Sequence, residues 1–259
     1  MSYTFDEKTR HDFFEYLLRL GDERLIHGHR LSEWCGHAPI LEEDIALANI
    51  ALDLIGQSSA LLTLAAEIAN KNRTEDDLAF FRTDVEFRDA NLVELPNNDF
   101  AYTTIKLFFH SAFSLYYLDE LSKVSFETLA GRAAKSLKEV KYHYRHSKDW
   151  VLKLGDGTQE SKNKIQNALN DYWMYLDELF YTDEIEESLS EINLAVKPNK
   201  LKEKVLSEIL KVLEEAALVI PDDKNQYLSI GRIGHHTEHL GHLLSELQIV
   251  ARSHPGAKW

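Results

Sequence analysis

The longest periodic segment of the chain covers residues 41–70, LEEDIALANIALDLIGQSSALLTLAAEIAN, which contain no Pro and a single Gly. Small and apolar residues recur along it at alternating steps of three and four. This spacing places them on one face of a helix and predicts a seam that packs along other helices. The seam residues are Ile45, Ala48, Leu52, Ile55, Ser59, Leu62, Ala66 and Ala69.

Two polar residues lie close to this predicted seam. With about 100° of rotation per residue, Asn49 and Asp53 fall in or beside the apolar face, one turn apart. A buried Asp costs several kcal/mol unless it is paired or binds a metal. The pattern therefore indicates either a binding site or a polar network inside the protein.

Periodic apolar positions predict helices along most of the remaining chain. They cover about residues 12–31, 74–81, 100–121, 126–154, 161–180, 183–190, 200–219 and 235–252. Asp12 is a candidate N-cap of the first, and Thr74, with Asp77 three residues later, is a candidate capping box for the second. Residues 1–10 are expected to form a polar arm, and residues 84–99 a mixed connection.

Four of the predicted helices are long, and an extended connection joins the second of these to the third. This pattern predicts an all-α, ferritin-like four-helix bundle with additional C-terminal helices. No internal repeat or low-complexity tract marks a domain boundary. We therefore expect residues 11–259 to form a single ferritin-like domain after the polar arm.

The composition narrows the possible partners and the compartment. The 259 residues carry a formal net charge of −14, so neither nucleic acid nor an anionic membrane is expected to bind directly. The single cysteine, Cys35, excludes an internal disulfide and a thiolate metal cluster. The N-terminal residues lack the apolar core of a signal peptide, and no apolar run reaches the length of a membrane span. We therefore expect a cytoplasmic protein.

A ferritin-like bundle commonly holds two irons, and a sequence can be tested for their ligands. Such a site takes a Glu from each of two helices and a Glu-x-x-His pair from each of the other two. None of the twelve histidines here has an acid three residues before it. Acid and histidine occur instead four residues apart, a spacing that suits a hydrogen bond along one helix face. These pairs are Glu23 with His27, Glu139 with His143 and Glu238 with His242.

The residues that stand where metal ligands would be expected are therefore interpreted as structural. Asn49 and Asp53 take the place of a second ligand pair on the central helix, and Glu139 with His143 lies on a later one. We expect these four side chains to form a buried polar network in place of a metal site, and no metal to bind this chain. A metal held by Glu139 and His143 is the alternative.

A further group of histidines lies near the predicted start of the last helix. His235, His239 and His242 can share one face, and three imidazoles could hold zinc or nickel. Because helix starts are exposed, an interface or a capping role is the preferred interpretation. The run from Lys197 to Lys211 intersperses lysines with acids and is interpreted as a solvated face.

Four motifs make the chain similar to one known family. They are LGDERLIHGHRLSEWCGHAPILEEDIALANIALDLIGQ (20–57), LVELPNNDFA (92–101), KEVKYHYRHSKDWVLKLGDGT (138–158) and HTEHLGHLLSEL (236–247). From about residue 16 onward the chain resembles the C subunits of the ring-1,2-phenylacetyl-CoA epoxidase, a multicomponent oxygenase of aerobic phenylacetate breakdown. EWCGHAP followed by IALANIALDLIGQ is not a pattern that a generic helical bundle would produce.

The resemblance implies a role as well as a fold. In this family the C subunit supports the catalytic A subunit, which alone carries the di-iron site. NADPH electrons reach the complex through a reductase component with flavin and iron–sulfur groups, and phenylacetyl-CoA is the substrate. The implied function of this chain is therefore that of a non-catalytic structural subunit.

The resemblance also implies that the chain lies close to the CoA substrate. The implied contact segment is Glu86, Phe87, Arg88 and Asp89, on the connection before the third long helix. Two other functions stay open: a di-iron oxygenase subunit with unusual ligands, and a ferritin-like binding protein without redox chemistry. Iron content and co-purification with a di-iron partner would distinguish the three.

Overall fold

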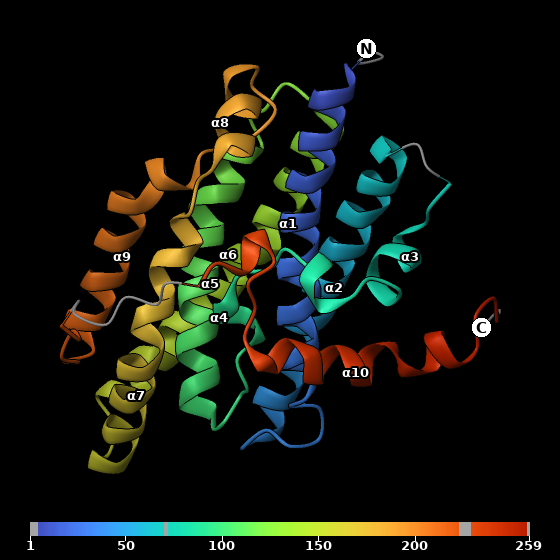
Figure 1. The fold of residues 1–259 in the computed structure, drawn as a ribbon. Helices are drawn as coiled ribbons and strands as arrows, with labels where there is room; N and C mark the ends of the chain where they lie inside the picture. Colours follow the sequence, from blue (N-terminus) through green and yellow to red (C-terminus); the bar gives the residue numbers. More distant parts are fainter. Residues whose placement is uncertain (1–4, 70–71, 223–228, 258–259) are drawn as a thin grey trace.

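Four long helices run side by side in two antiparallel pairs (Figure 1). α1 (Glu7–Ser32) packs along α2 (Leu41–Ala69), and α5 (Phe100–Leu121) packs along α6 (Glu127–Gly155). Contacts between α2 and α6 join the two pairs. The structure, a computed structural model, describes residues 5–69, 72–222 and 229–257. Every regular element in those ranges is a helix, and the predicted all-α, ferritin-like bundle is confirmed.

α1 begins earlier than the sequence pattern suggests. Asp6 is its N-cap and accepts a hydrogen bond from the Thr9 backbone N–H at 2.7 Å. Asp12 is therefore not the cap: it lies within the helix and accepts a hydrogen bond from Lys8 Nζ at 2.9 Å. The expected polar arm of residues 1–10 is accordingly wrong in its second part, which is helical, and its beginning lies outside the described residues.

The first half of α2 turns its predicted seam outward. Ile45 and Leu52 are 54% and 67% exposed, whereas Leu47, Ile50 and Leu54 are buried. The prediction was wrong here because this half of the helix is apolar on most sides, so its periodicity does not decide which face packs. Farther along the helix, the buried members of the seam are Leu62 and Ala66.

Exposed apolar side chains form a stripe on α2. Leu41, Ile45 and Leu52 are spaced by four and seven residues, which places them on one side of the helix, and all three are exposed. We call these three residues the α2 stripe. By length and composition alone, α2 is also apolar enough to cross a membrane, but half of its most apolar stretch is buried inside the protein. The core helix of a helical bundle has the same length and composition.

The connection between α2 and α5 contains three short helical elements, α3 (Glu75–Phe80), η1 (Asp84–Glu86) and α4 (Asn91–Glu94). The predicted capping box is confirmed at the start of α3. Thr74 Oγ1 accepts from the Asp77 backbone N–H at 3.2 Å, and the Asp77 carboxylate accepts from the Thr74 backbone N–H at 2.8 Å. After η1 the connection turns inward, so that α4 is buried against α1.

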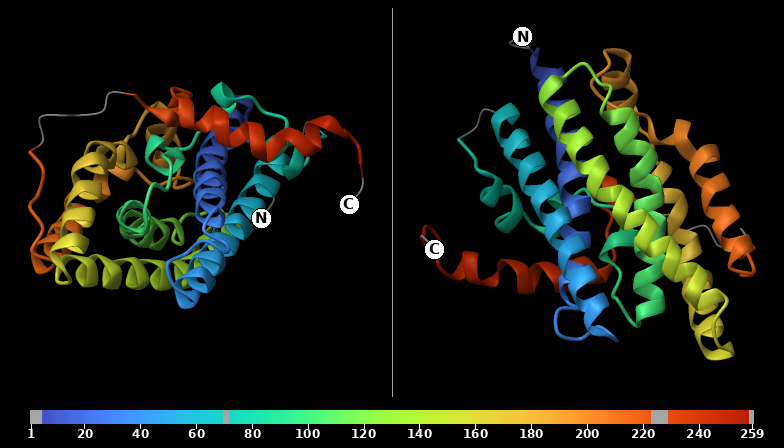
Figure 2. Two further views of the ribbon diagram at one scale, coloured as in Figure 1. Left: turned by 90° about the horizontal axis from the view of Figure 1, so that it is seen from below. Right: turned by 180° about the vertical axis from the view of Figure 1, so that it is seen from behind.

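Further helical elements follow the bundle. They are α7 (Gln159–Tyr172), η2 (Trp173–Phe180), α8 (Glu184–Glu191), η3 (Pro198–Leu201), α9 (Lys202–Glu215), η4 (Gly231–Ile233) and α10 (Glu238–Ser253). They confirm the predicted additional C-terminal helices. α10 crosses the long helices and contacts α3, η1 and α4 (Figure 2). The last helix thus covers the connection between the two halves of the bundle.

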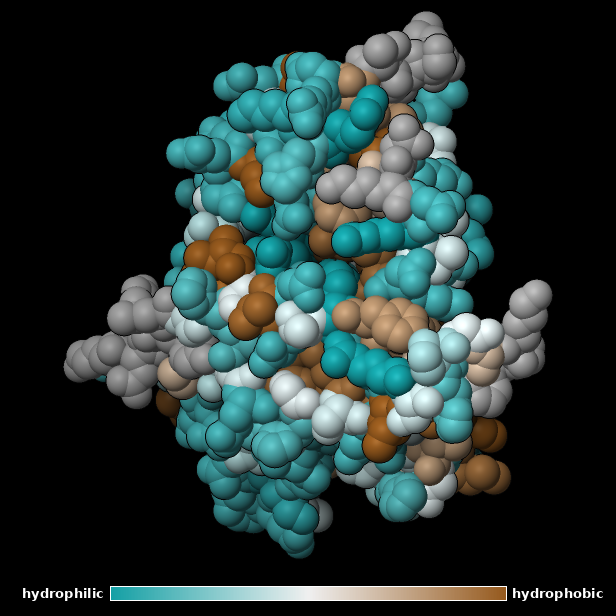
Figure 3. Space-filling view, turned by 45° about the vertical axis from the view of Figure 1, so that its right-hand side comes forward, coloured by the Kyte–Doolittle hydropathy of each residue, from teal (hydrophilic) through white to brown (hydrophobic). Residues whose placement is uncertain are grey.

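α1 is enclosed over most of its length. Its residues from Tyr16 to Gly28 are all buried, although they include Arg19, Asp22, Glu23, Arg24 and His27. The outer surface on the side of α10 is mostly hydrophilic, with apolar side chains in separate groups (Figure 3). The charged side chains that would normally lie on the surface are therefore found inside the bundle, along α1.

Candidate functional site

A buried ion pair joins the middle of α1 to the segment before α10. Arg232 Nη2 donates to Glu23 Oε2 at 2.6 Å, and His110 Nε2 on α5 lies 3.3 Å from Glu23 Oε1. All three side chains are almost fully buried. Burial alone would raise the pKa of Glu23, but Arg232 and His110 together hold it well below its ordinary value. Glu23 is therefore a buried carboxylate that keeps its charge.

His27 and His110 face each other across the interior. Their ring centroids are 4.5 Å apart at an interplanar angle of 84°, and neither ring nitrogen of His27 has a hydrogen-bond partner among the described residues. Burial, with His110 and Lys106 nearby, lowers the pKa of His27 well below its usual value, so the ring is neutral. The expected bond between Glu23 and His27 along one helix face is wrong, because Glu23 is bound to Arg232 instead.

The structure brings Asp53 and His143 together from α2 and α6. His143 Nε2 lies 2.9 Å from Asp53 Oδ2, with the histidine buried and the Asp53 side chain 36% exposed. Burial lowers the pKa of His143, and Asp53 opposes this shift. Asn49, in contrast, is exposed, so its expected place in a buried network is wrong. The rotation of α2 that turns its stripe outward carries Asn49 with it.

Glu139 joins a second chain of hydrogen bonds. Gln57 Nε2 donates to Glu139 Oε2 at 2.8 Å, and Arg24 Nε donates to Gln57 Oε1 at 3.1 Å. Arg24 Nη1 also donates to the Leu20 carbonyl oxygen at 2.8 Å. Neither Gln57 nor Arg24 was predicted from the sequence. The signal available was that Gln57 lies one turn after Asp53, on the same side of α2.

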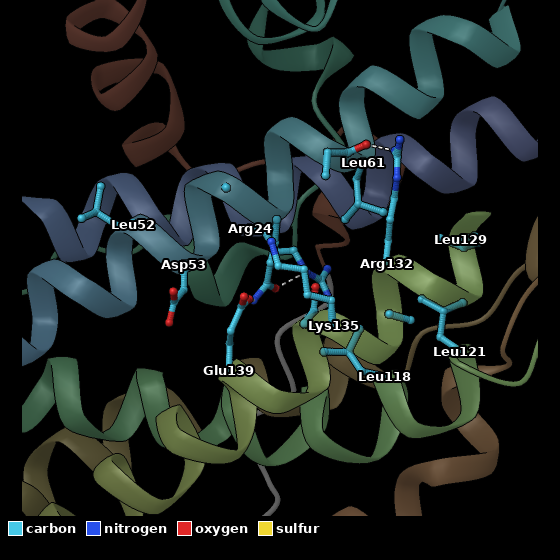
Figure 4. Close-up of a pocket in the computed structure, with 15 residues that line it drawn as sticks. Arg24, Leu52, Asp53, Leu61, Leu118, Leu121, Leu129, Arg132, Lys135 and Glu139 are labelled. Atoms are coloured by element: carbon cyan, nitrogen blue, oxygen red, sulfur yellow. Dashed lines mark hydrogen bonds between the residues drawn. The ribbon is translucent and has the colours of Figure 1, made fainter. Parts of the chain in front are cut away.

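These side chains border a small cavity between the helices. It has a volume of about 180 Å³, and its polar lining includes Arg24, Asp53, Gln57, Arg132 and Glu139. Figure 4 shows Arg24, Asp53 and Glu139 reaching into the space between the helices from α1, α2 and α6. The lining carries charges of both signs, and these side chains already bind other groups of the protein: Arg132 donates to the Ala60 carbonyl oxygen, and Gln57 lies between Arg24 and Glu139. The cavity can therefore hold only a few atoms of any ligand.

The histidines near α10 do not form the expected group. α10 begins at Glu238 after the N-cap Thr237, so His235 lies before the helix rather than on one face with His239 and His242. His235 and His242 are exposed. The Thr237 hydroxyl accepts a hydrogen bond from the His239 backbone N–H, and this cap makes the helix begin three residues later than expected.

His236 turns inward instead and meets two acids of the connection. One ligand atom from each of Asp89, Glu94 and His236 lies within 4.8 Å of the others. Burial opposes protonation of this histidine, but Glu94 and Asp89 raise its pKa to about 9. This cluster was not predicted from the sequence, because His236 lies far along the chain from Asp89 and Glu94.

The implied substrate-contacting segment is only partly accessible. Phe87 and Asp89 are fully buried, whereas Glu86 is exposed. Arg88 Nε donates to Glu15 Oε2 at 3.0 Å, and Arg88 Nη1 donates to the Phe87 carbonyl oxygen at 2.8 Å. Of these four residues, only Glu86 and Arg88 present side chains that an outside ligand could reach in this structure.

Two comparisons with known proteins relate the chain to a family. The sequence model of the family described as phenylacetic acid catabolic protein matches residues 2–259. The chain is also 44% identical, over 244 residues, to the protein of Escherichia coli strain K12 that is named as the C subunit of 1,2-phenylacetyl-CoA epoxidase. That match covers 94% of this chain and 98% of the relative. The chain belongs to the phenylacetic acid catabolic protein family.

Proposed function

We propose that this chain is a non-catalytic structural subunit of a phenylacetyl-CoA epoxidase, and that it supports a partner A subunit that carries the di-iron site. The name of the Escherichia coli relative, an epoxidase subunit, supports a role in a complex of several components. The reductase groups, NADPH, flavin and iron–sulfur, belong to another component in this proposal, and phenylacetyl-CoA is bound through the complex. The proposed compartment is the cytoplasm.

The observation that carries the proposal is that the Arg24 guanidinium is buried inside the bundle, where a di-iron site would need negatively charged ligands. A di-iron site of this fold takes a Glu from each of two helices and a Glu-x-x-His pair from the other two. Here Glu139 is bound to Gln57, whose amide oxygen accepts from Arg24. Glu23 is paired with Arg232. The donor set does not match two irons, because Glu23 is paired with a buried arginine, Glu139 is bound by a glutamine amide, and the Arg24 guanidinium adds a positive charge near Glu23.

The α2 stripe supports a docking role. Leu41, Ile45 and Leu52 are large apolar side chains on one side of a rigid helix, and each is more than half exposed. Contiguous exposed apolar side chains of this kind mark protein–protein contacts more often than chance. The stripe adjoins the cavity at Leu52, so a partner that covers it would also close the cavity mouth.

The test is co-expression with the catalytic subunit, followed by sizing and metal analysis of each species. The expected result is a stable complex in which the di-iron site follows the partner, while the isolated chain forms no di-iron site. About two irons per isolated chain after reconstitution would instead support a di-iron oxygenase subunit with unusual ligands. A chain that stays alone in the presence of the partner would support a ferritin-like binding protein.

A further inference from the structure

Three buried side chains from two distant segments meet beside α4. Glu94 is the last residue of this short helix, Asp89 lies just before its N-cap, and His236 comes from the segment just before α10. One carboxylate oxygen of each acid and one imidazole nitrogen lie within 4.8 Å of one another. Neither acid has any exposed surface, and the His236 side chain is 5% exposed. Water has little access to these charges.

The lone pairs that converge here lack hydrogen-bond partners. Both carboxylate oxygens of Asp89, Oε2 of Glu94 and Nδ1 of His236 have none among the described residues, and the nearest ion-pair contact of Nδ1, with Glu94 Oε1, is 3.7 Å long. Buried polar atoms are nearly always satisfied, and a buried carboxylate without a partner is costly. The guanidiniums of the region are bound elsewhere, since Arg82 pairs with Asp22 and Arg232 with Glu23.

The surrounding backbone orients these ligands. His236 Nε2 lies 3.0 Å from the carbonyl oxygen of Phe87, so Nε2 carries a proton and Nδ1 is the nitrogen that a cation would bind in place of its own proton. The Thr237 backbone N–H donates to Glu94 Oε1 at 3.0 Å, which fixes the carboxylate and leaves Oε2 free. Metal-binding histidines usually donate their other ring N–H to a carbonyl or carboxylate in this way.

Gly231 allows the two segments to come this close. A Cβ at this position would collide with the Asp89 carbonyl oxygen and would lie 3.1 Å from His236 Nδ1. Any side chain there would push the segment before α10 away from the connection. The close approach of three ligand-bearing residues therefore depends on a glycine.

We propose that Asp89, Glu94 and His236 bind one divalent first-row cation, with Zn²⁺ as the best fit. A cation that displaces the protons of these ligands meets two carboxylates and one neutral imidazole, with a total charge of −2, which a divalent ion neutralises. A mixed set of oxygen and imidazole nitrogen is typical of zinc, whereas Mg²⁺ and Ca²⁺ prefer oxygen ligands throughout. Because the site is closed to solvent, the ion is structural and ties the α2–α5 connection to the segment before α10.

The site is separate from the proposed epoxidase role, so it can be tested on the full-length chain without a partner. Chelator-treated protein is titrated with Zn²⁺ by calorimetry and with Co²⁺ by visible absorption. We expect one tight ion per chain, a Co²⁺ spectrum of low coordination number and a higher melting temperature with Zn²⁺. His236→Gln should weaken the tight binding about 100-fold or more, because losing even an outer partner of a metal ligand typically costs 10–100-fold.

Matched variants separate this site from surface histidines. His242→Gln removes an exposed histidine of α10 and should leave the tight ion in place. Asp89→Asn should abolish the tight binding of the ion. If Asp89→Asn does not fold, His236→Gln provides the same test. If a proton satisfies the carboxylates instead, metal-free wild-type protein will bind Zn²⁺ no more tightly than His236→Gln does. That result would overturn the proposal.

Discussion

Arg232 Nη2 donates to Glu23 Oε2 at 2.6 Å, which links the segment before α10 to the middle of α1. Both side chains are almost fully buried, so the pair lies in a medium of low polarity. A buried ion pair is weak evidence of net stability, but removing one partner leaves an uncompensated charge. The link therefore makes the position of the C-terminal segment depend on a charge inside the bundle.

Replacing Glu23 should be strongly destabilising. Glu23→Gln leaves the Arg232 guanidinium buried without a counter-charge, and we expect the free energy of unfolding to fall by about 3–5 kcal/mol. Urea denaturation measures this loss. Glu15→Gln is the control, since the pair of Glu15 with Arg88 is partly exposed and should be worth about 1 kcal/mol or less. Equal losses in both variants would contradict the prediction.

The same ion pair should make the free energy of unfolding depend on pH in the acidic range. The pKa of Glu23 in the folded protein lies well below its ordinary value of 4.5. Its contribution is therefore complete above that value and is lost as the pH falls through the folded pKa. The difference in unfolding free energy between wild type and Glu23→Gln should thus stay constant above about pH 4.5 and shrink as the pH falls below that value.

The bond between Asp53 and His143 should contribute much less. Burial lowers the pKa of His143, so the ring is neutral near pH 7, and Asp53 is partly exposed. Asp53→Ala should therefore cost about 1 kcal/mol, the worth of one ordinary hydrogen bond. A loss as large as that of Glu23→Gln, measured in the same urea series, would show that His143 is charged.

Helix positions followed from the sequence far better than helix faces did. α5 has the predicted bounds, because Asp99 caps it with hydrogen bonds to the backbone N–H groups of Ala101 and Tyr102. Caps are local, so a sequence pattern can identify them. The face that α2 buries is set by which helices surround it, and a helix that is apolar on most sides carries no such information.

The candidate sites were only partly predictable for a related reason. Asp53 and His143 were singled out as polar residues on apolar helices, but their pairing across α2 and α6 is a property of the bundle. Spacing rules detect ligands that share one helix. They could not bring His236 to Asp89 and Glu94, because only the crossing of α10 over the connection does so.

Lys106 should give the protein a second pH dependence, in the alkaline range. This lysine is fully buried, and its Nζ donates to the Leu95 carbonyl oxygen at 2.6 Å. Burial and the neighbouring Arg30 lower its pKa to about 7 from an ordinary 10.5. The unfolded chain thus binds more protons between these values, so stability should rise with pH there.

The test compares unfolding free energies of wild type and Lys106→Met between about pH 7 and pH 10. As the pH rises, the unfolding free energy of wild type should increase relative to that of the variant by up to about 1.4 kcal/mol per pH unit. Lys138→Met removes an exposed lysine of α6 and should follow the wild-type slope. A Lys106→Met curve parallel to wild type would show that the amine stays charged.

The α2 stripe should govern assembly rather than folding. Leu52→Glu places a charge on an exposed position, so the stability of the isolated chain should change by about 0.5 kcal/mol or less. Under the proposed function it should weaken the complex with the A subunit by tenfold or more, as about 1.4 kcal/mol corresponds to tenfold. Ile249→Glu, at a similarly exposed position on α10, is the control. If both variants bind the A subunit with the same affinity, the α2 stripe is not part of the interface.

Phenylacetyl-CoA should bind weakly to this chain alone. CoA carries several phosphate charges, whereas the chain has 29 basic and 43 acidic residues. Arg88 is the accessible cation of the implied contact segment, but its guanidinium is already bound to Glu15 and to carbonyl oxygens of its own connection. The partner subunit must therefore supply most of the affinity in the proposed complex.

Calorimetric titration of phenylacetyl-CoA into the isolated chain and into the complex tests this. We expect tight binding to the complex only, and Arg88→Ala in the complex should weaken it by at most one charge-assisted hydrogen bond, about 1.5–3 kcal/mol. Arg145→Ala, at an exposed position on α6, should have no effect. Equal and tight binding to the isolated chain would show that this subunit holds the substrate, because no contribution from the partner would then be needed.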